Sequence, residues 1–214
     1  MGMKRAIINV STNNAWYAKG QERLRKSIPG ENFFGMLGEA SVLAPAHTRV
    51  PYAFKPLALD YLHNKGYDLV LWLDASMWAV KPLDGVWDII ERKGWLMEES
   101  GHYLGRWCND RALANMGITR EQAMKITMYS AGMTGLNLKK AKCQNFLMEW
   151  KKYALDMETF VGSHTDHRHD MSVASFLANK YEMDYERGGT YLAYIGKVYG
   201  QPSETSVFHL AGMS

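Results

Sequence analysis

The clearest pattern in the chain is a run of five apolar residues, 69–73, that ends in an acidic residue, Asp74. A glycine precedes the run at position 66, and a Val and a Trp lie within it, which is typical of a short strand buried on both faces. Ser76 follows two positions after the acid. Because open α/β sheets bind ligands at the carboxyl ends of their strands, this corner is a candidate site. On this stretch alone, a carboxylate that caps the following turn is an equally good interpretation.

Apolar residues elsewhere recur with the period of helices or strands. Residues 54–62 and 139–154 each place apolar side chains on one stripe, which predicts amphipathic helices. A Thr followed by Gln at 119–122 is a capping-box pattern, and predicts a helix to about residue 126. Residues 30–40 are rich in Gly and are predicted as a loop. Further strands are predicted at 6–10, 41–43, 94–97, 128–138, 191–199 and 207–212, and further helices at 21–27, 83–92 and from 170 onward.

Strands that alternate with helices predict an α/β fold. The length of 214 residues, 47% of them apolar, suits one domain spanning residues 1–214. The Gly-rich fingerprint of dinucleotide-binding folds is missing after the first predicted strand, which argues against an NAD enzyme. A polar turn at 11–14 stands in its place, followed by Tyr17. Stacking of Tyr17 on a nucleobase and packing of Tyr17 in the core are equally good interpretations.

Charge and cysteine content narrow the function. The 25 basic and 22 acidic residues give a net charge of +3 and form no basic arm, so the composition offers no support for a nucleic-acid binder. The mild positive charge suits a polyanionic small ligand such as a nucleotide. Cys108 and Cys143 are too far apart for a Cys-x-x-Cys site, and we expect free thiols in a reducing, cytoplasmic compartment. No stretch reaches the roughly 18 apolar residues of a membrane span.

Two isolated residues carry candidate chemistry. Lys55 lies at the start of the helix predicted at 54–62, where the helix dipole disfavours a cation. It is therefore expected either to face an anion or to be solvated. Gly132 interrupts the strand predicted at 128–138, as a glycine does where a ligand or another backbone comes close.

Residues 163–172 form a polar segment with three histidines, and this segment leads into a helix at Asp170. The histidines lack the spacing of four on a helix that zinc hydrolases use. Asp170 is a candidate helix cap or a candidate catalytic carboxylate. Near the C-terminus His209 stands in a short apolar run, where a structural role is more common than a ligand role.

Four segments, in their order along the chain, resemble motifs of GT-A glycosyltransferases. Residues 54–76 are similar to the helix and strand that lead to the family's Asp-x-Asp motif, and residues 131–137 resemble the Gly-rich segment beside the donor sugar. Residues 168–173 resemble the start of a helix on the acceptor side. Residues 208–212 resemble the C-terminal segment whose histidine completes the family's metal site. The resemblance implies a Rossmann-like mixed, mostly parallel sheet flanked by helices. Within the family the chain resembles the N-terminal transferase domain of multidomain glycosyltransferases of chlorella viruses, which implies a piece of a longer protein.

The resemblance also implies a function, which is the transfer of a sugar of glucose or rhamnose type from a UDP-sugar to a glycan hydroxyl. It places Mn²⁺ or Mg²⁺ on Asp74, Ser76 and His209. Ser76 stands where the family usually has a second Asp, and a hydroxyl is a weaker ligand, so the ion would depend more on the diphosphate. The implied nucleotide contacts are Val10, Ser11, Thr12, Tyr17, Lys55 and Asp74, and the implied donor-sugar contacts are Gly132, Met133 and Asp170.

The role of Asp170 and the class of function stay open at this point. In an inverting enzyme Asp170 would be the general base, and in a retaining enzyme it would position the sugar or stabilise a cationic transition state. Ser76 also permits a domain that binds nucleotide sugars without turnover. The histidine-rich segment permits a metal-dependent phosphohydrolase.

Overall fold

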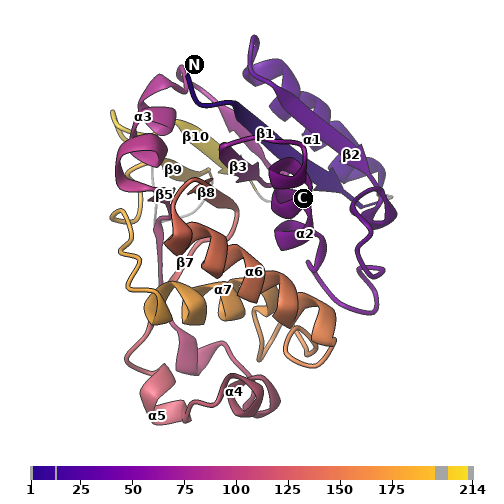
Figure 1. The fold of residues 1–214 in the computed structure, drawn as a ribbon, viewed down its shortest axis with the longest axis vertical. Helices are drawn as coiled ribbons and strands as arrows, with labels where there is room; N and C mark the ends of the chain where they lie inside the picture. The colour runs from indigo at the N-terminus through magenta and orange to yellow at the C-terminus, as the bar shows by residue number, and fades with distance from the viewer. Residues whose placement is uncertain (1, 13, 196–201, 212–214) are drawn as a thin grey trace.

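A computed structural model describes residues 2–12, 14–195 and 202–211, and in these residues the central sheet has the strand order β2-β1-β3-β8-β5 (Figure 1). Strands β2, β1 and β3 are parallel, whereas β8 is antiparallel to both β3 and β5, so β8 alone among the five strands runs the other way. The predicted mixed, mostly parallel sheet is therefore confirmed. The strands are β1 (Arg5–Ser11), β2 (Phe33–Leu37), β3 (Leu69–Leu73), β5 (Trp95–Leu96) and β8 (Met133–Asn137).

A smaller sheet brings the end of the chain next to the candidate site. Its order is β4-β10-β9, with β4 (Met77–Ala79) starting three residues after Asp74. Strand β10 (Phe208–Ala211) is antiparallel to β4 and parallel to β9 (Leu192–Ile195). The part of the strand prediction 191–199 that follows residue 195 lies outside the described residues. A third, two-stranded sheet pairs β6 (Glu99–Tyr103) with β7 (Thr127–Tyr129).

Helices cover both faces of the central sheet, because alternate residues of each strand point to opposite sides. Val70 and Trp72 of β3 pack with α2 (Phe54–Asn64), α6 (Ala141–Asp156) and α7 (His169–Lys180). Leu69, Leu71 and Leu73 pack on the other side with α1 (Ala15–Ser27) and α3 (Asp84–Lys93). Strand β3 is buried along its whole length, as its apolar run predicted.

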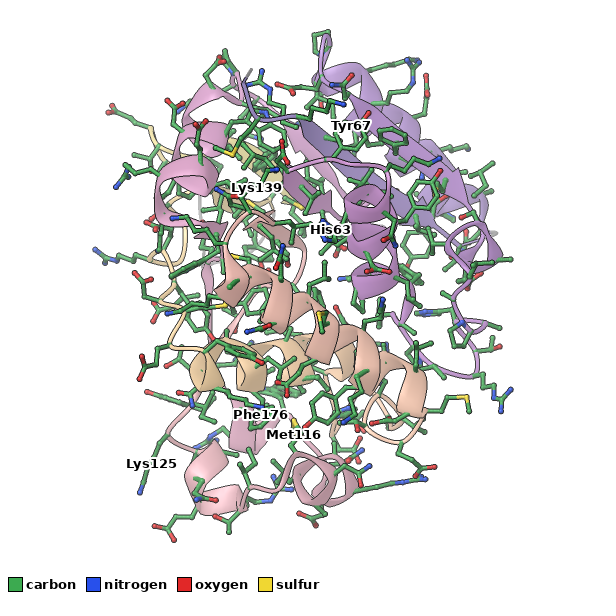
Figure 2. All side chains as sticks on the ribbon, in the orientation of Figure 1. His63, Tyr67, Met116, Lys125, Lys139 and Phe176 are labelled. Atoms are coloured by element: carbon green, nitrogen blue, oxygen red, sulfur yellow. The ribbon has the colours of Figure 1, made fainter. Side chains whose placement is uncertain are left out.

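Two short helices, α4 (Asp110–Met116) and α5 (Arg120–Ala123), lie at the end of the molecule opposite the N-terminus (Figure 1). Met116 of α4 and Phe176 of α7 belong to the same apolar cluster, which joins this end to the core (Figure 2). The capping box predicted at 119–122 is present, with Thr119 and Gln122 bonding each other's backbone.

Two predictions between residues 30 and 43 are wrong. The predicted loop 30–40 contains β2, a strand that forms because Phe33 and its apolar neighbours pair in parallel with β1. The predicted strand 41–43 is instead part of a 3-10 turn, Glu39–Val42, which Leu43 ends in the left-handed region at φ 57°. Pairing with β1, which is distant in the sequence, decided the first outcome, and local composition did not reveal it.

Helix α1 begins earlier than predicted. It starts at Ala15, not at residue 21, because the side chain of Asn14 accepts a hydrogen bond from the backbone N–H of Trp16 and caps the helix. Tyr17 therefore lies in the first turn of the helix, directly after β1. Cys108 and Cys143 are buried free thiols, as predicted. None of the helices in the described ranges is long and apolar enough to cross a membrane.

Candidate active site

Asp74 marks the carboxyl end of β3. Its backbone N–H donates to the carbonyl of Gly132 at 2.9 Å, which ties it to the turn between β7 and β8. Its Oδ1 accepts a hydrogen bond from Nε1 of Trp72 at 2.8 Å. The side chain is 31% exposed, so the carboxylate is oriented by these contacts and still reaches solvent.

A cleft of about 370 Å³ opens beside this carboxylate. One part of its wall comes from the end of β1 and the start of α1, another from the loop before α2, and a third from β10. It lies at the carboxyl ends of β1 and β3, which is where open α/β sheets bind ligands. Residues that line it include Val10, Thr12, Tyr17, Tyr52, Asp74 and Ser76.

Lys55 connects Asp74 to Asp170. It lies in the first turn of α2 and is 4% exposed. Its Nζ is 3.0 Å from Oδ1 of Asp74 and 3.0 Å from Oδ2 of Asp170, and it donates to the carbonyl oxygen of Ala131 at 3.0 Å. Three oxygen atoms therefore lie close to the ammonium. The sequence alternative of a solvated Lys55 is wrong, because this cation faces two anions.

The electrostatics of this group follow from its burial. Burial alone would lower the pKa of Lys55, but Asp170 and Asp74 outweigh it and raise that pKa above its usual range. For Asp170 burial is the larger effect, so its pKa rises to about 6 although Lys55 lowers it. The ion pair between them is not aligned as a hydrogen bond, since Oδ2 of Asp170 accepts none within the described residues. A carboxylate with this pKa can gain or lose a proton near neutral pH.

Asp170 lies in the first turn of α7, directly after a strained residue. His169 has a φ of 43°, which non-glycine residues rarely adopt. Asp170 is not the N-cap of α7, because Arg168 occupies that position. Asp170 is 4% exposed. It pairs with Lys55, which lines the cleft, but Asp170 is not among the described residues of the cleft wall.

The histidines before α7 support the backbone. His167 bonds the carbonyl of Thr159 through Nε2 at 2.9 Å, and His169 bonds the carbonyl of Phe160 through Nδ1 at 2.8 Å. Across the described ranges, no group of three His, Cys, Asp or Glu side chains is placed to hold a metal ion. The histidine-rich segment therefore gives no support to a hydrolase metal centre.

Most of the predicted nucleotide contacts come together. Val10, Thr12, Tyr17, Lys55 and Asp74 all line the cleft. Ser11 is buried, and its carbonyl accepts from the backbone of Gly38. Of the predicted donor-sugar contacts, Gly132 lies beside Asp74. A Cβ at this position would be 3.4 Å from Oδ2 of Asp74. Met133 points into the cluster on the far face of the sheet, away from the described wall of the cleft.

The predicted metal ligands come together only in part. Asp74 and Ser76 share the cleft, and the carbonyl of Ser76 accepts from the guanidinium of Arg23 at 2.9 Å. His209 pairs with Trp78 across β10 and β4, and the two rings meet edge to face with centroids 5.6 Å apart. Its neighbour Leu210 lines the cleft, whereas the described wall does not include His209. Asp74 is therefore the one anionic side chain among the predicted metal ligands, and it lines the cleft; a divalent ion there would need most of its ligands from outside the protein.

Sequence reasoning missed three residues of the site. Tyr52 and His47 line the cleft from the loop before α2, and Asn9 lines it from β1. Nδ2 of Asn9 donates to the carbonyl of Leu73 at 2.7 Å and so fixes the end of β3. The only available signal for Asn9 was a polar residue inside an apolar strand. Nothing in the local sequence marked Tyr52.

Comparison with known proteins places the fold. No protein-family model matches the chain, and no curated protein sequence does. A glycosyltransferase involved in the glycosylation of the major capsid of the chlorella virus PBCV-1 superposes with a TM-score of 0.60 at 12% identity, over 96% of this chain and 93% of that chain. For mouse xyloside xylosyltransferase 1 the TM-score is 0.57 at 8% identity, over 97% of each chain.

A third solved structure is similar over only part of its length. The bifunctional glycosyltransferase WbbM gives a TM-score of 0.55 at 10% identity, over 98% of this chain and 46% of that chain. At such low identity these likenesses concern the arrangement of strands and helices. They confirm the predicted fold, which is that of GT-A glycosyltransferases.

Proposed function

We propose that this chain is a glycosyltransferase that moves a sugar, of glucose or rhamnose type, from a UDP-sugar to a hydroxyl of a glycan acceptor. One observation carries the proposal. In a GT-A fold, Asp74 opens onto the cleft at the end of β3 and is joined through buried Lys55 to Asp170. A cleft lined by aromatic and polar side chains and a carboxylate suits a nucleotide sugar.

The reaction requires three tasks of the site. The acceptor oxygen forms a bond to the anomeric carbon while the bond from that carbon to the diphosphate breaks, and UDP leaves with the electron pair. The uridine must be held, for which Val10, Thr12 and Tyr17 are available in the cleft. The proton of the acceptor hydroxyl must be removed, and the charge that develops on the diphosphate must be stabilised.

For the charge on the diphosphate, we propose Mn²⁺ or Mg²⁺ held by Asp74, with the hydroxyl of Ser76 beside it. Such an ion supplies Lewis-acid stabilisation of a leaving diphosphate. Because the ring of His209 packs against Trp78, the remaining ligands would come from the nucleotide and water. Metal and nucleotide should therefore bind together, and either alone should bind weakly.

For the proton, we propose Asp170. With a pKa of about 6, it is largely ionised at neutral pH and can accept a proton from the acceptor hydroxyl in an inverting reaction. In a retaining reaction, the same negative charge would stabilise positive charge on the donor sugar. The anomeric configuration of the product, measured by NMR, distinguishes these two roles.

A panel of UDP-sugars with Mn²⁺, scored by UDP release, tests the proposal. Asp74→Asn should abolish metal-dependent release, because an amide is a poor substitute for an anionic metal ligand. Asp60→Asn is the matched control, since Asp60 pairs with Lys151 away from the cleft. An Asp74→Asn variant that retains release would contradict the metal assignment.

The replacement of a second acid by Ser76 favours one alternative, a domain that binds nucleotide sugars without turnover. Binding of a UDP-sugar without any UDP release would support that alternative. A phosphohydrolase would instead release inorganic phosphate.

A further inference from the structure

Tyr52 has a backbone conformation that large side chains rarely adopt. Its φ is 62°, and His169, whose ring centroid lies 5.9 Å from that of Tyr52, has a φ of 43°. Such conformations cost about 1–3 kcal/mol each and cluster at functional sites. Two strained residues from distant parts of the chain therefore meet here, Tyr52 at the cleft and His169 buried beside it.

Three rings form this surface, which we call the aromatic wall: His47, Tyr52 and His164. The centroid of Tyr52 is 4.6 Å from that of His47 and 5.7 Å from that of His164, both edge to face. The hydroxyl of Tyr52 is 3.5 Å from Nε2 of His164. Tyr52 and His47 line the cleft, and His164 is exposed at the outer end of the wall.

The aromatic wall adjoins the acid to which we assign the acceptor proton. The ring of Tyr52 lies 5.2 Å from Nζ of Lys55, and that nitrogen is 3.0 Å from Asp170. The proposed uridine contacts come from a different part of the cleft, formed by the end of β1 and the start of α1. A ligand on the aromatic wall would therefore sit next to the reacting groups and leave the nucleotide contacts free.

The chemistry of the wall selects a neutral, hydroxylated ring. Burial lowers the pKa of His47, and it lowers the pKa of the adjoining His169 to about 4, so these imidazoles are neutral at pH 7. Nδ1 of His47 accepts the backbone N–H of Tyr52 at 3.1 Å, so neutral His47 carries its proton on Nε2 and can donate it to a sugar hydroxyl. The face of an aromatic ring packs well against the C–H face of a sugar.

We propose that the aromatic wall is the acceptor subsite, where a pyranose ring of the acceptor packs on Tyr52 and its hydroxyls bond to His47 and His164. This inference rests on the proposed function for the identity of its ligand. It adds a place for the acceptor and a chemical class, a neutral pyranoside. It also explains why a strained tyrosine stands beside a buried acid.

Saturation-transfer NMR with simple pyranosides tests the subsite without turnover. The probes are the methyl glycosides of glucose, galactose, xylose and rhamnose, each mixed with UDP and the protein. The C–H protons of at least one probe should receive saturation. Tyr52→Leu should reduce that signal about 3- to 10-fold relative to the uridine signal. This is the loss of affinity expected when one aromatic contact is removed. Tyr52→Phe retains the ring and should keep the signal, as should Tyr103→Leu, a surface control.

Three results would overturn the subsite. One is that no probe receives saturation from the wild-type protein. A second is that Tyr52→Leu lowers the uridine signal and spares the pyranoside, which would make Tyr52 a base-stacking residue. The third applies if Tyr52→Leu loses both signals, which would mean that the variant is misfolded. His164→Ala, at an exposed position, is then measured, and an unchanged pyranoside signal in that variant would refute the subsite.

The same samples separate failure of the subsite from failure of the proposed function. Pyranoside binding that depends on Tyr52, without UDP release from any UDP-sugar, would retain the subsite and refute the transferase. UDP release without pyranoside binding at the wall would retain the transferase and refute the subsite.

Discussion

Replacing Lys55 with Met tests whether one buried cation holds the candidate site together. The ammonium lies 3.0 Å from an oxygen of each of three groups: the Asp74 carboxylate, the Asp170 carboxylate and the Ala131 carbonyl. Methionine retains much of the side-chain volume and removes the charge and all three donors. Because Asp170 is 4% exposed, its carboxylate is then buried without a cation.

Two estimates bracket the cost. Removing one partner of a buried ion pair costs about 3–5 kcal/mol, against a total stability of about 5–15 kcal/mol. Asp170 can limit the loss by taking up a proton. At pH 7 this costs about 4 kcal/mol, since its usual pKa is near 3.9 and each pH unit is worth about 1.4 kcal/mol. We therefore expect Lys55→Met to lose about 3–4 kcal/mol at pH 7.

Urea unfolding at pH 7 and pH 5 provides the measurement. In the variant, folded Asp170 binds a proton that the unfolded chain does not bind, so the free energy of unfolding rises as the pH falls. From this group the variant gains about 3 kcal/mol between pH 7 and pH 5. The wild type, with a pKa of about 6, gains about half as much. The loss should thus shrink by about 1–2 kcal/mol at pH 5.

Two further variants complete the test. Lys55→Met combined with Asp170→Asn should recover most of the loss, because no charged partner is left buried. Lys151→Met breaks a partly exposed pair with Asp60 at 2.9 Å and should cost about 0–1 kcal/mol. A loss below about 1 kcal/mol for Lys55→Met at pH 7, or a double variant no more stable than the single one, would refute the reasoning.

Three other outcomes are expected. The pH profile of kcat/KM should show an acid limb near pH 6, where Asp170 gains its proton, and Asp170→Asn should lack it; a wild-type profile flat to pH 5 would contradict this role. His209→Ala should leave Mn²⁺ affinity of the UDP complex within about twofold in an EPR titration, and a tenfold loss would place His209 at the metal. Gly20→Ala should cost about 1–3 kcal/mol or more in urea unfolding, because its Cβ would overlap the carbonyl oxygen of Ala75, and a neutral result would mean that α1 shifts freely.

The parts of the fold that the sequence predicted well are those with strong local signals. Strand β3 has an uninterrupted apolar run, and α2 and α6 have apolar stripes of helical period. Strand β2 carries no such signal, because Gly35 interrupts it and its residues are only half-buried or exposed. It is a strand because it pairs with β1 in parallel register, from Ile7 opposite Phe33 onward. A pattern read along the chain does not contain that partner.

The candidate site divides in the same way. The position of Asp74 followed from the end of an apolar strand, and an anion facing Lys55 was one of two alternatives that its unfavourable place on a helix left open. The φ of Tyr52 and the orientation of His209 depend on residues far away in the sequence. Their contacts, with His164 and Trp78 respectively, exist only after the sheets have assembled.

The surroundings of Asp74 determine how a cation can bind there. Oδ1 already accepts from Trp72 and faces Lys55, whereas Oδ2 faces Gly132, which has no side chain to cover it. With both acids ionised, Asp74, Asp170 and Lys55 together carry a single negative charge. A divalent ion at Oδ2 would lie near the ammonium and would gain too little from that one charge to offset its lost hydration. The diphosphate of the proposed donor would supply the missing negative charge, so we expect the protein to take up the metal as a complex with the nucleotide.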